Sequence, residues 1–141
     1  MFVNPDAQRL REWLEATRTI AVVGLSPKPD RPSHSVARAM QGFGYRIVPV
    51  NPGQATLLGE PCWPTLSDIP PDVRAGIDLV DVFRQSDAVP GIVDECIALG
   101  LRRLWLQDGV VDEASALRAQ AAGIEVVMDR CVYRDYVHLV R

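Results

Sequence analysis

The feature that most constrains the fold is the run TIAVVGL, which spans residues 19–25. It is apolar at almost every position rather than at alternate positions, which is typical of a strand buried on both faces. Similar runs occur at residues 45–50, 77–83, 101–106 and 124–128. A strand that is covered on both faces needs a layer above it and another below it. The pattern therefore favours a parallel sheet sandwiched between helices.

Helical segments separate these runs. Leu10, Trp13 and Leu14 have helical spacing before the first run, and Val36 and Met40 have it after that run. Residues 51–71 are rich in proline and glycine, and we expect them to hold only a short turn near residues 65–69. The residues expected to cap or end the helices are Asn4, Ser86, Asp112, Gly100 and Gly123.

This alternation predicts the α/β class: a single Rossmann-like three-layer domain over residues 1–141. Its sheet is expected to be mostly parallel and five-stranded, with helices on both faces. Residues 1–18 are expected to form an N-terminal helix that packs on the domain. A chain of 141 residues is long enough to bury a substantial core, and its 48% apolar content disfavours disorder.

Charge and cysteine content exclude several classes of protein. A formal net charge of −3 argues against a protein that coats nucleic acid or an anionic membrane. No signal peptide or membrane-length apolar run is visible, so a cytoplasmic location is expected. Cys62, Cys96 and Cys131 match neither a disulfide framework nor a zinc spacing, and each is expected to pack in the core as a small hydrophobe.

The topology also predicts where a ligand binds. In a sheet of this kind, ligands bind beyond the carboxyl ends of the strands, beside the first strand, where the strand order reverses. The loops that meet this condition are residues 24–34, 51–53, 84–86, 107–109 and 129–131.

The first of these loops has features of a phosphate site. Gly24 stands alone, so the three-glycine dinucleotide fingerprint is absent. Ser26 can donate a hydroxyl hydrogen bond, while Lys28, the only lysine of the chain, and Arg31 supply positive charge. The amides of the helix that starts near Ser33 add a partial positive charge. The loop is equally well interpreted as a holder for a di- or polyphosphate or as a stiff connector whose charges are merely solvated.

The second strand narrows the type of nucleotide. It ends in Val50, Asn51 and Pro52, without the acid that usually binds the ribose hydroxyls of NAD. A phosphorylated ribose, as in NADP or coenzyme A, remains open. Arg84, which follows the third strand, is either the partner of that phosphate or part of a surface salt bridge.

Catalytic residue patterns are scarce. His34 and His138 are the only histidines, and no serine lies in a G-x-S-x-G elbow. His34 is expected at a helix start, touching solvent or phosphate. Asp78 and Asp81 are expected on opposite faces of one strand, which prevents them from acting as an acid–base pair. The sequence predicts neither a catalytic group nor a metal site.

Six blocks of the sequence, taken together, resemble a known family. They read GLSPKPDRPS, YRIVPVNP, LGEPCWPTLSDIP, IDLVDVFR, WLQDGV and VVMDRC. In this order they resemble the small CoA-binding-domain proteins of bacteria and archaea. These proteins are similar to the CoA-binding part of the succinyl-CoA synthetase alpha subunit. The resemblance extends from residue 19 to about residue 136 and implies coenzyme A or an acyl-CoA as the ligand.

The resemblance also implies roles for particular segments. The first loop would hold the CoA phosphates, residues 51–52 would lie beside the nucleotide, residues 82–84 would border the cofactor, and residues 107–109 would lie near its pantetheine arm. The cofactor-binding residues expected on this basis are Gly24, Ser26, Pro27, Lys28, Arg31, Ser33, His34, Asn51, Pro52, Val82, Phe83, Arg84, Gln107 and Gly109.

The chain also departs from the synthetase pattern. The synthetase subunit has a second domain with a phosphorylated histidine, and neither His34 nor His138 lies in a matching context. The resemblance therefore favours a CoA-binding module without catalysis of its own, with a protein partner left open. The alternatives are a detached CoA-binding subunit of a nucleotide-forming acyl-CoA synthetase and, less favoured, an NADP-dependent oxidoreductase.

Overall fold

The central sheet has five strands in the order β2-β1-β5-β6-β7, and every neighbouring pair is parallel. The computed structural model describes residues 1–141. The strands are β1 (Thr19–Val23), β2 (Arg46–Val50), β5 (Leu79–Val82), β6 (Arg103–Leu106) and β7 (Glu125–Val127). Each strand lies within a predicted apolar run and is shorter than it, because residues at the ends of the run leave the sheet to enter loops. The predicted α/β class and five-stranded sheet are confirmed.

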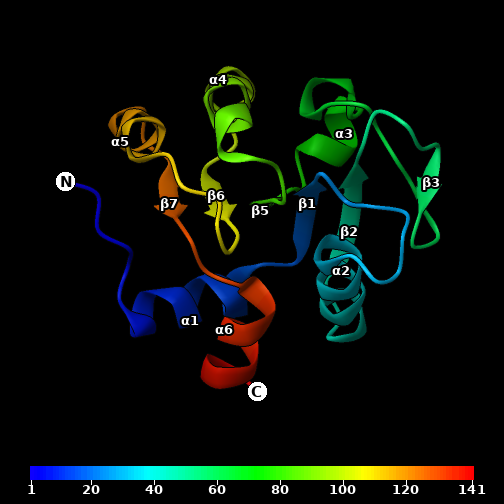
Figure 1. Cartoon of the computed structure of the whole chain (residues 1–141), viewed down its shortest axis with the longest axis horizontal. Coiled ribbons are helices and arrows are strands. Elements are labelled where there is room, and N and C mark those ends of the chain that lie inside the picture. The colour runs from blue at the N-terminus through cyan, green and yellow to red at the C-terminus, as the bar shows by residue number, and fades with distance from the viewer.

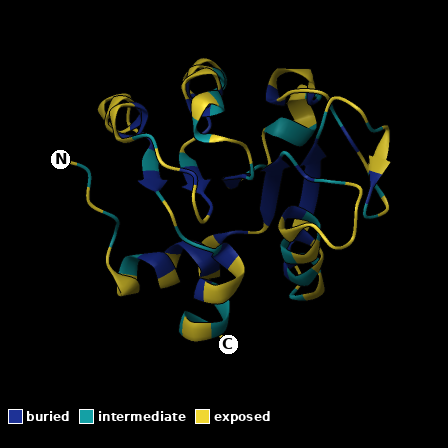
Figure 2. Ribbon diagram, in the orientation of Figure 1, coloured by how far each residue is buried: buried dark blue, intermediate teal, exposed yellow.

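Helices cover both faces of the sheet (Figure 1). One face is covered by α1 (Ala7–Ala16), α2 (Pro32–Gly42) and α6 (Val132–Leu139). The other is covered by α3 (Pro71–Arg74), α4 (Val89–Leu99) and α5 (Glu113–Ala121), with the 3-10 turns η1 (Leu66–Asp68) and η2 (Ser86–Ala88). Alternate strand residues point into separate cores: Val22 belongs to the core that includes Leu10 and Met40, whereas Val23 belongs to the core that includes Val89 and Val93. The buried strands form the dark centre of Figure 2.

The first helix begins differently from the prediction. Asp6, not Asn4, is its N-cap, and the Asp6 carboxylate accepts a hydrogen bond from the backbone N–H of Arg9. The prediction that Asn4 is the cap is wrong. The side chain of Asn4 instead donates to the carbonyl of Met128 at 2.9 Å and accepts from the N–H of Met128 at 2.8 Å. This residue therefore fastens the N-terminal segment to the end of β7.

The cap predicted at Ser86 is also wrong. A 3-10 turn intervenes before α4, and the Ser86 hydroxyl accepts a hydrogen bond from the backbone N–H of Val111 at 2.9 Å. Asp112 caps α5 by accepting from the N–H of Ser115, as predicted. Gly100 ends α4 in the left-handed region, as predicted.

Besides the four-residue helix α3, two features are absent from the prediction. The first is a hairpin of β3 (Thr56–Leu57) and β4 (Glu60–Pro61), which turns at Leu58 and Gly59 with positive φ at both residues. The expectation of only a short turn in residues 51–71 is therefore incomplete, although η1 lies where that turn was expected. The second is α6, whose Tyr136 stacks on Phe43 with the ring centroids 4.2 Å apart.

The cysteines are all free. Cys62 and Cys96 are buried in the two cores, as predicted. Cys131 is only partly buried, because it lies at the N-cap of α6 rather than inside a core. None of the helices has the length and apolar character needed to cross a membrane.

Candidate functional site

A cleft of about 620 Å³ opens at the carboxyl ends of β1, β5 and β6. The chain crosses from β1 to β2 on one side and returns to β5 on the other side of β1, so the strand order reverses here. The cleft therefore lies where ligands bind in open α/β sheets. The loop after β1 contributes Gly24, Ser26, Lys28, Arg31, Pro32 and Ser33; the loop after β5 contributes Phe83, Arg84 and Gln85; the loop after β6 contributes Gln107, Asp108, Gly109 and Val110.

Gly24 lets the loops after β1 and β5 approach one another closely. Its φ is +86°, a conformation that residues with a Cβ rarely adopt. A Cβ at this position would lie 2.5 Å from the backbone oxygen of Phe83 and 2.9 Å from Cδ of Arg84. The glycine is thus needed for contact between two loops of the protein itself.

Hydrogen bonds hold the loop after β1 against the first turn of α2. The backbone N–H of Ser26 donates to Oγ of Ser33 at 2.9 Å. The carbonyl of Ser26 lies 2.9 Å from Nδ1 of His34, which must be the donor because a carbonyl oxygen only accepts. The hydroxyl of Ser26 accepts from the N–H of Lys28 at 3.1 Å. These contacts and the intervening prolines fix the loop above the helix start.

The cleft has a cationic side. Lys28, Arg31 and Arg84 are exposed, and none of the seven ion pairs of the protein includes them. Arg31 is the N-cap of helix α2, and no side chain caps this helix by a hydrogen bond, so no acidic side chain offsets the partial positive charge of its N-terminus. The three free cations and this helix start make the side suitable for a polyanion.

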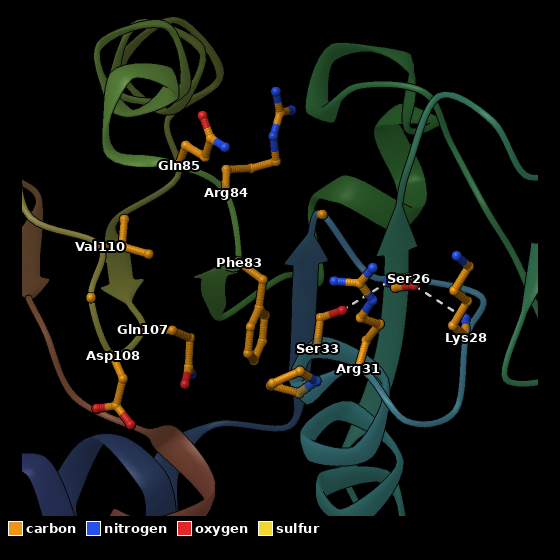
Figure 3. Close-up of a pocket in the computed structure, with 13 residues that line it drawn as sticks. Ser26, Lys28, Arg31, Ser33, Phe83, Arg84, Gln85, Gln107, Asp108 and Val110 are labelled. Atoms are coloured by element: carbon orange, nitrogen blue, oxygen red, sulfur yellow. Dashed lines mark hydrogen bonds between the residues drawn. The ribbon is translucent and has the colours of Figure 1, made fainter.

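The opposite side of the cleft is formed by the loop after β6 (Figure 3). Asp108 forms a two-pronged ion pair with Arg134 of α6, at 2.9 and 3.1 Å. The hydrogen bond to Asp108 raises the pKa of Arg134. The N–H of Gly109 donates to the carboxylate of Asp129 at 2.7 Å. In Figure 3, Gln107 and Asp108 lie across the cleft from Arg31 and Lys28, with Phe83 between them.

Most of the expected site residues lie on the cleft, and the others do not. Those that line it are Gly24, Ser26, Lys28, Arg31, Ser33, Phe83, Arg84, Gln107 and Gly109; those that do not are Pro27, His34, Asn51, Pro52 and Val82. Val82 is fully buried within β5. The amide of Asn51 is engaged by the protein, because it donates to the carbonyl of Leu25 and accepts from the N–H of Gly53.

The cleft also includes residues that the sequence did not single out. Pro32, Gln85, Asp108 and Val110 complete its lining. Gln85 and Asp108 fall inside loops expected at the site, but nothing in their residue type separates them from other loop residues. Val110 continues an apolar pattern and therefore resembles a core residue.

Asp81 lies beneath the cleft in β5 and is only 1% exposed. Its Oδ1 accepts a hydrogen bond from Nε2 of Gln107 at 2.6 Å. Burial raises the pKa of Asp81 to about 7, while the hydrogen bond from Gln107 acts in the opposite direction. The sequence signal for this residue is its position, because an acid inside the otherwise apolar run IDLVDVF is unusual.

A parallel sheet of this order, with a cationic cleft where its strand order reverses, defines a Rossmann-like α/β domain. The chain belongs to the CoA binding domain family, whose model matches residues 18–136. Across 129 residues it is 40% identical to the protein YneT of Bacillus subtilis, covering 92% of this chain and 93% of that protein.

Solved structures agree with this assignment. The protein cell-free ID.343 from Thermus thermophilus superposes with a TM-score of 0.87 at 37% identity, over 96% of this chain and 99% of that one. The acetyl-coenzyme A synthetase 1 of Ca. Korarchaeum cryptofilum matches with a TM-score of 0.65 at 26% identity, over 77% of this chain but only 25% of that one.

The ligases share only a region with this chain. Acetate–CoA ligase [ADP-forming] I of Archaeoglobus fulgidus is 24% identical over 131 residues, which cover 86% of this chain and 18% of the ligase. The chain is thus homologous to the CoA-binding region of ADP-forming acetyl-CoA synthetases.

Proposed function

We propose that this protein binds coenzyme A or an acyl-CoA in the cleft and performs no chemistry on it by itself. The observation that supports this best is that two loops contribute three unpaired cations to the lining of the cleft, which also includes the uncapped start of α2. Free cations beside open helix amides favour a ligand with several phosphate charges.

The residues present suit the chemistry of coenzyme A. Lys28, Arg31 and the backbone N–H of Ser33 would hold its diphosphate, because Pro32 has no N–H and those of His34 and Ser35 donate to the carbonyl of Arg31. Arg84, on the neighbouring loop, would pair with its ribose phosphate. The chain has no carboxylate directly after β2 to repel that phosphate, because Asn51 and Pro52 stand there. The uncharged pantetheine arm would then extend toward Gln107 and Gly109, away from the cations.

Calorimetric titration tests the proposal. CoA is expected to bind saturably, dephospho-CoA more weakly because it lacks the ribose phosphate, and NADP more weakly than CoA. Lys28→Ala and Arg31→Ala should each lose ~1–3 kcal/mol of binding free energy if they form charge-assisted phosphate contacts. Arg38→Ala is the matched control, because Arg38 lies exposed on α2 outside the cleft. Absence of saturable CoA binding at millimolar concentration would overturn the proposal.

The same titration distinguishes the proposed CoA-binding protein from an enzyme that uses a nicotinamide cofactor. Tighter binding of NADP than of CoA would favour an NADP-dependent oxidoreductase instead. Native mass spectrometry of freshly purified protein adds an independent test, because a retained ligand reports its class by its mass. A retained mass of CoA or an acyl-CoA supports the proposal.

The match to the ligases favours a second candidate function. The chain would then be the detached CoA-binding subunit of a nucleotide-forming acyl-CoA synthetase, acting with a partner chain that supplies the nucleotide-binding and phosphohistidine elements. Co-purification with such a chain, and CoA-dependent ligase activity of the mixture, would support this candidate. Inactivity of every such mixture would remove it.

A cytoplasmic location forms part of the proposal. All three cysteines are free, as is usual for proteins of a reducing compartment. Cell fractionation followed by detection of the native protein tests this location directly.

A further inference from the structure

The hydrogen-bonded pair of Asp81 and Gln107 lies at the base of the cleft and has no evident role in the fold. Asp81 stands in the middle of the sheet, in register with Val22 on one side and Trp105 on the other. Burying a carboxylate among such neighbours is costly unless it is paired. Gln107, itself only 3% exposed, supplies the single hydrogen bond that Asp81 receives.

No charged group compensates Asp81. The charged and titratable side chains on the elements that cover its face of the sheet contact other partners or are exposed. Arg9 of α1 pairs with Glu12 and Glu125, Arg130 pairs with Asp135, and Arg134 of α6 pairs with Asp108. His34 of α2 contacts the carbonyl of Ser26, and Arg38 is exposed. The Gln107 amide is therefore the polar group that stabilises the Asp81 carboxylate.

The pair fixes how the Gln107 amide is turned. An ionised carboxylate only accepts hydrogen bonds, so it holds Nε2 of Gln107 toward itself. No protein group donates to Oε1 of Gln107, yet no buried side-chain polar atom of the protein lacks a partner. Oε1 is therefore accessible, and the cleft is the space that Gln107 borders.

We propose that Asp81 is a positioning residue that holds the Gln107 amide with its carbonyl oxygen toward the cleft, so that the site selects a ligand with an N–H or O–H donor at this depth. The identity of this ligand rests on the proposed function. If the ligand is CoA, the donor is an amide N–H of its pantetheine arm. The cations lie across the cleft, so the phosphates of such a ligand are drawn to the other side.

Protonation of Asp81 allows the side-chain amide of Gln107 to turn over. A protonated carboxyl also donates, so it can hold Oε1 of Gln107 and turn Nε2 toward the cleft, where a ligand donor is no longer accepted. Because burial raises the pKa of Asp81 to about 7, the change falls near neutral pH. A ligand N–H bound to Oε1 favours the ionised form, so ligand binding near pH 7 releases a proton from Asp81.

The test compares the wild-type protein with Asp81→Asn, which keeps the shape of the side chain but removes the charge. Calorimetry near pH 7 in two buffers of different ionisation enthalpy measures the protons released on binding CoA. The wild type is expected to release more protons than the variant, and the phosphates of CoA cancel in this comparison because they titrate with both proteins. The variant should bind CoA about two- to tenfold more weakly, the range of one hydrogen bond.

Two further measurements separate positioning from a merely structural role. Adenosine 3′,5′-bisphosphate lacks the pantetheine arm, so both proteins should bind it equally. In a Gln107→Leu background, Asp81→Asn should have no further effect on CoA affinity. Equal CoA affinity and equal proton release for wild type and Asp81→Asn, or an equal loss for the bisphosphate, would overturn the proposal.

Nuclear magnetic resonance of the free protein tests the Asp81–Gln107 coupling without any ligand. The side-chain amide resonances of Gln107 should titrate with a midpoint near pH 7 in the wild type and stay constant in Asp81→Asn; constant resonances in both proteins would overturn the coupling. A wild type that shows this titration but binds no CoA would overturn the proposed function and the pantetheine assignment while supporting the coupling.

Discussion

Replacing Gly24 by alanine should destabilise the protein through two separable effects. The first is conformational, because φ is +86° at this residue and a residue with a Cβ is strained there by about 1–3 kcal/mol. The second is steric, because the new Cβ would lie 2.5 Å from the backbone oxygen of Phe83. Backbone cannot move aside as a flexible side chain can, so overpacking adds about 1–3 kcal/mol. Alanine also lowers the conformational entropy of the unfolded chain, which raises the free energy of unfolding by about 0.4–1 kcal/mol. The net loss is about 1–6 kcal/mol.

Gly123→Ala provides the matched control. Gly123 has nearly the same φ, +88°, but a Cβ there would meet no atom within 4 Å. The two variants therefore share the conformational term and the unfolded-state term, and only Gly24→Ala includes the clash. The free energy of unfolding, measured by urea denaturation, should fall about 1–3 kcal/mol further for Gly24→Ala than for Gly123→Ala. Equal losses in the two variants would refute the argument that Gly24 is required by the neighbouring loop.

Three further predictions concern buried groups. Because the pKa of Asp81 is raised from 3.8 to about 7 on folding, the native state binds this proton more tightly, and the free energy of unfolding should decline by up to about 4 kcal/mol between pH 4 and pH 7. Urea denaturation across this range should show that decline in the wild type and not in Asp81→Asn. Cys131, which is partly exposed, should be alkylated well before Cys96, because burial raises the pKa of Cys96 to about 12. Mass spectrometry of partly modified native protein gives the order of modification. Equal rates at the two cysteines would contradict the prediction. Arg130→Met should lower the free energy of unfolding, measured by heat or urea, by about 1–3 kcal/mol, because it leaves the carboxylate of Asp135 buried without its guanidinium partner. The Arg130 side chain is 42% exposed, so the loss should be smaller than for a fully buried pair. An unchanged unfolding midpoint would show that solvent replaces the guanidinium.

The sheet could be predicted because its strands are buried on both faces. Residues 19–23 lie between two layers, so nearly every position in β1 is apolar and the run is visible in the sequence. The position of the cleft followed from the same property, since parallel strands connected by helices place their following loops at one edge. The loops after β1, β5 and β6, each expected at the site, do line the cleft.

The parts that the prediction missed either depend on specific side-chain contacts or are too short to show a pattern. Helix α6 is held by the stacking of its Tyr136 on Phe43 and by the pairing of its buried Asp135 with Arg130. Neither interaction is visible as a local pattern. The β3–β4 hairpin has two residues in each strand, too few to show an alternation.

Predicting helix caps from residue type alone also assigned the wrong role to two polar residues. Asn4 and Ser86 have the residue types that cap helices, but both are satisfied by distant backbone groups, at Met128 and Val111 respectively. The pairing of Asp81 with Gln107 could not be predicted for the same reason, because it depends on the register between β5 and β6.

The attachment of Asn4 to Met128 has a consequence for how copies of this protein meet one another. Strand β7 is the last strand of the sheet and has β6 on only one side, so its other side is open to pairing with a foreign strand. Asn4 engages both the N–H and the carbonyl of Met128, at the end of this strand, and Arg9 pairs with Glu125 at its start. The N-terminal segment is thus attached near both ends of β7, through a side chain at Glu125 and through the backbone at Met128. The backbone groups of Met128 that Asn4 occupies are therefore not free to pair with a foreign strand.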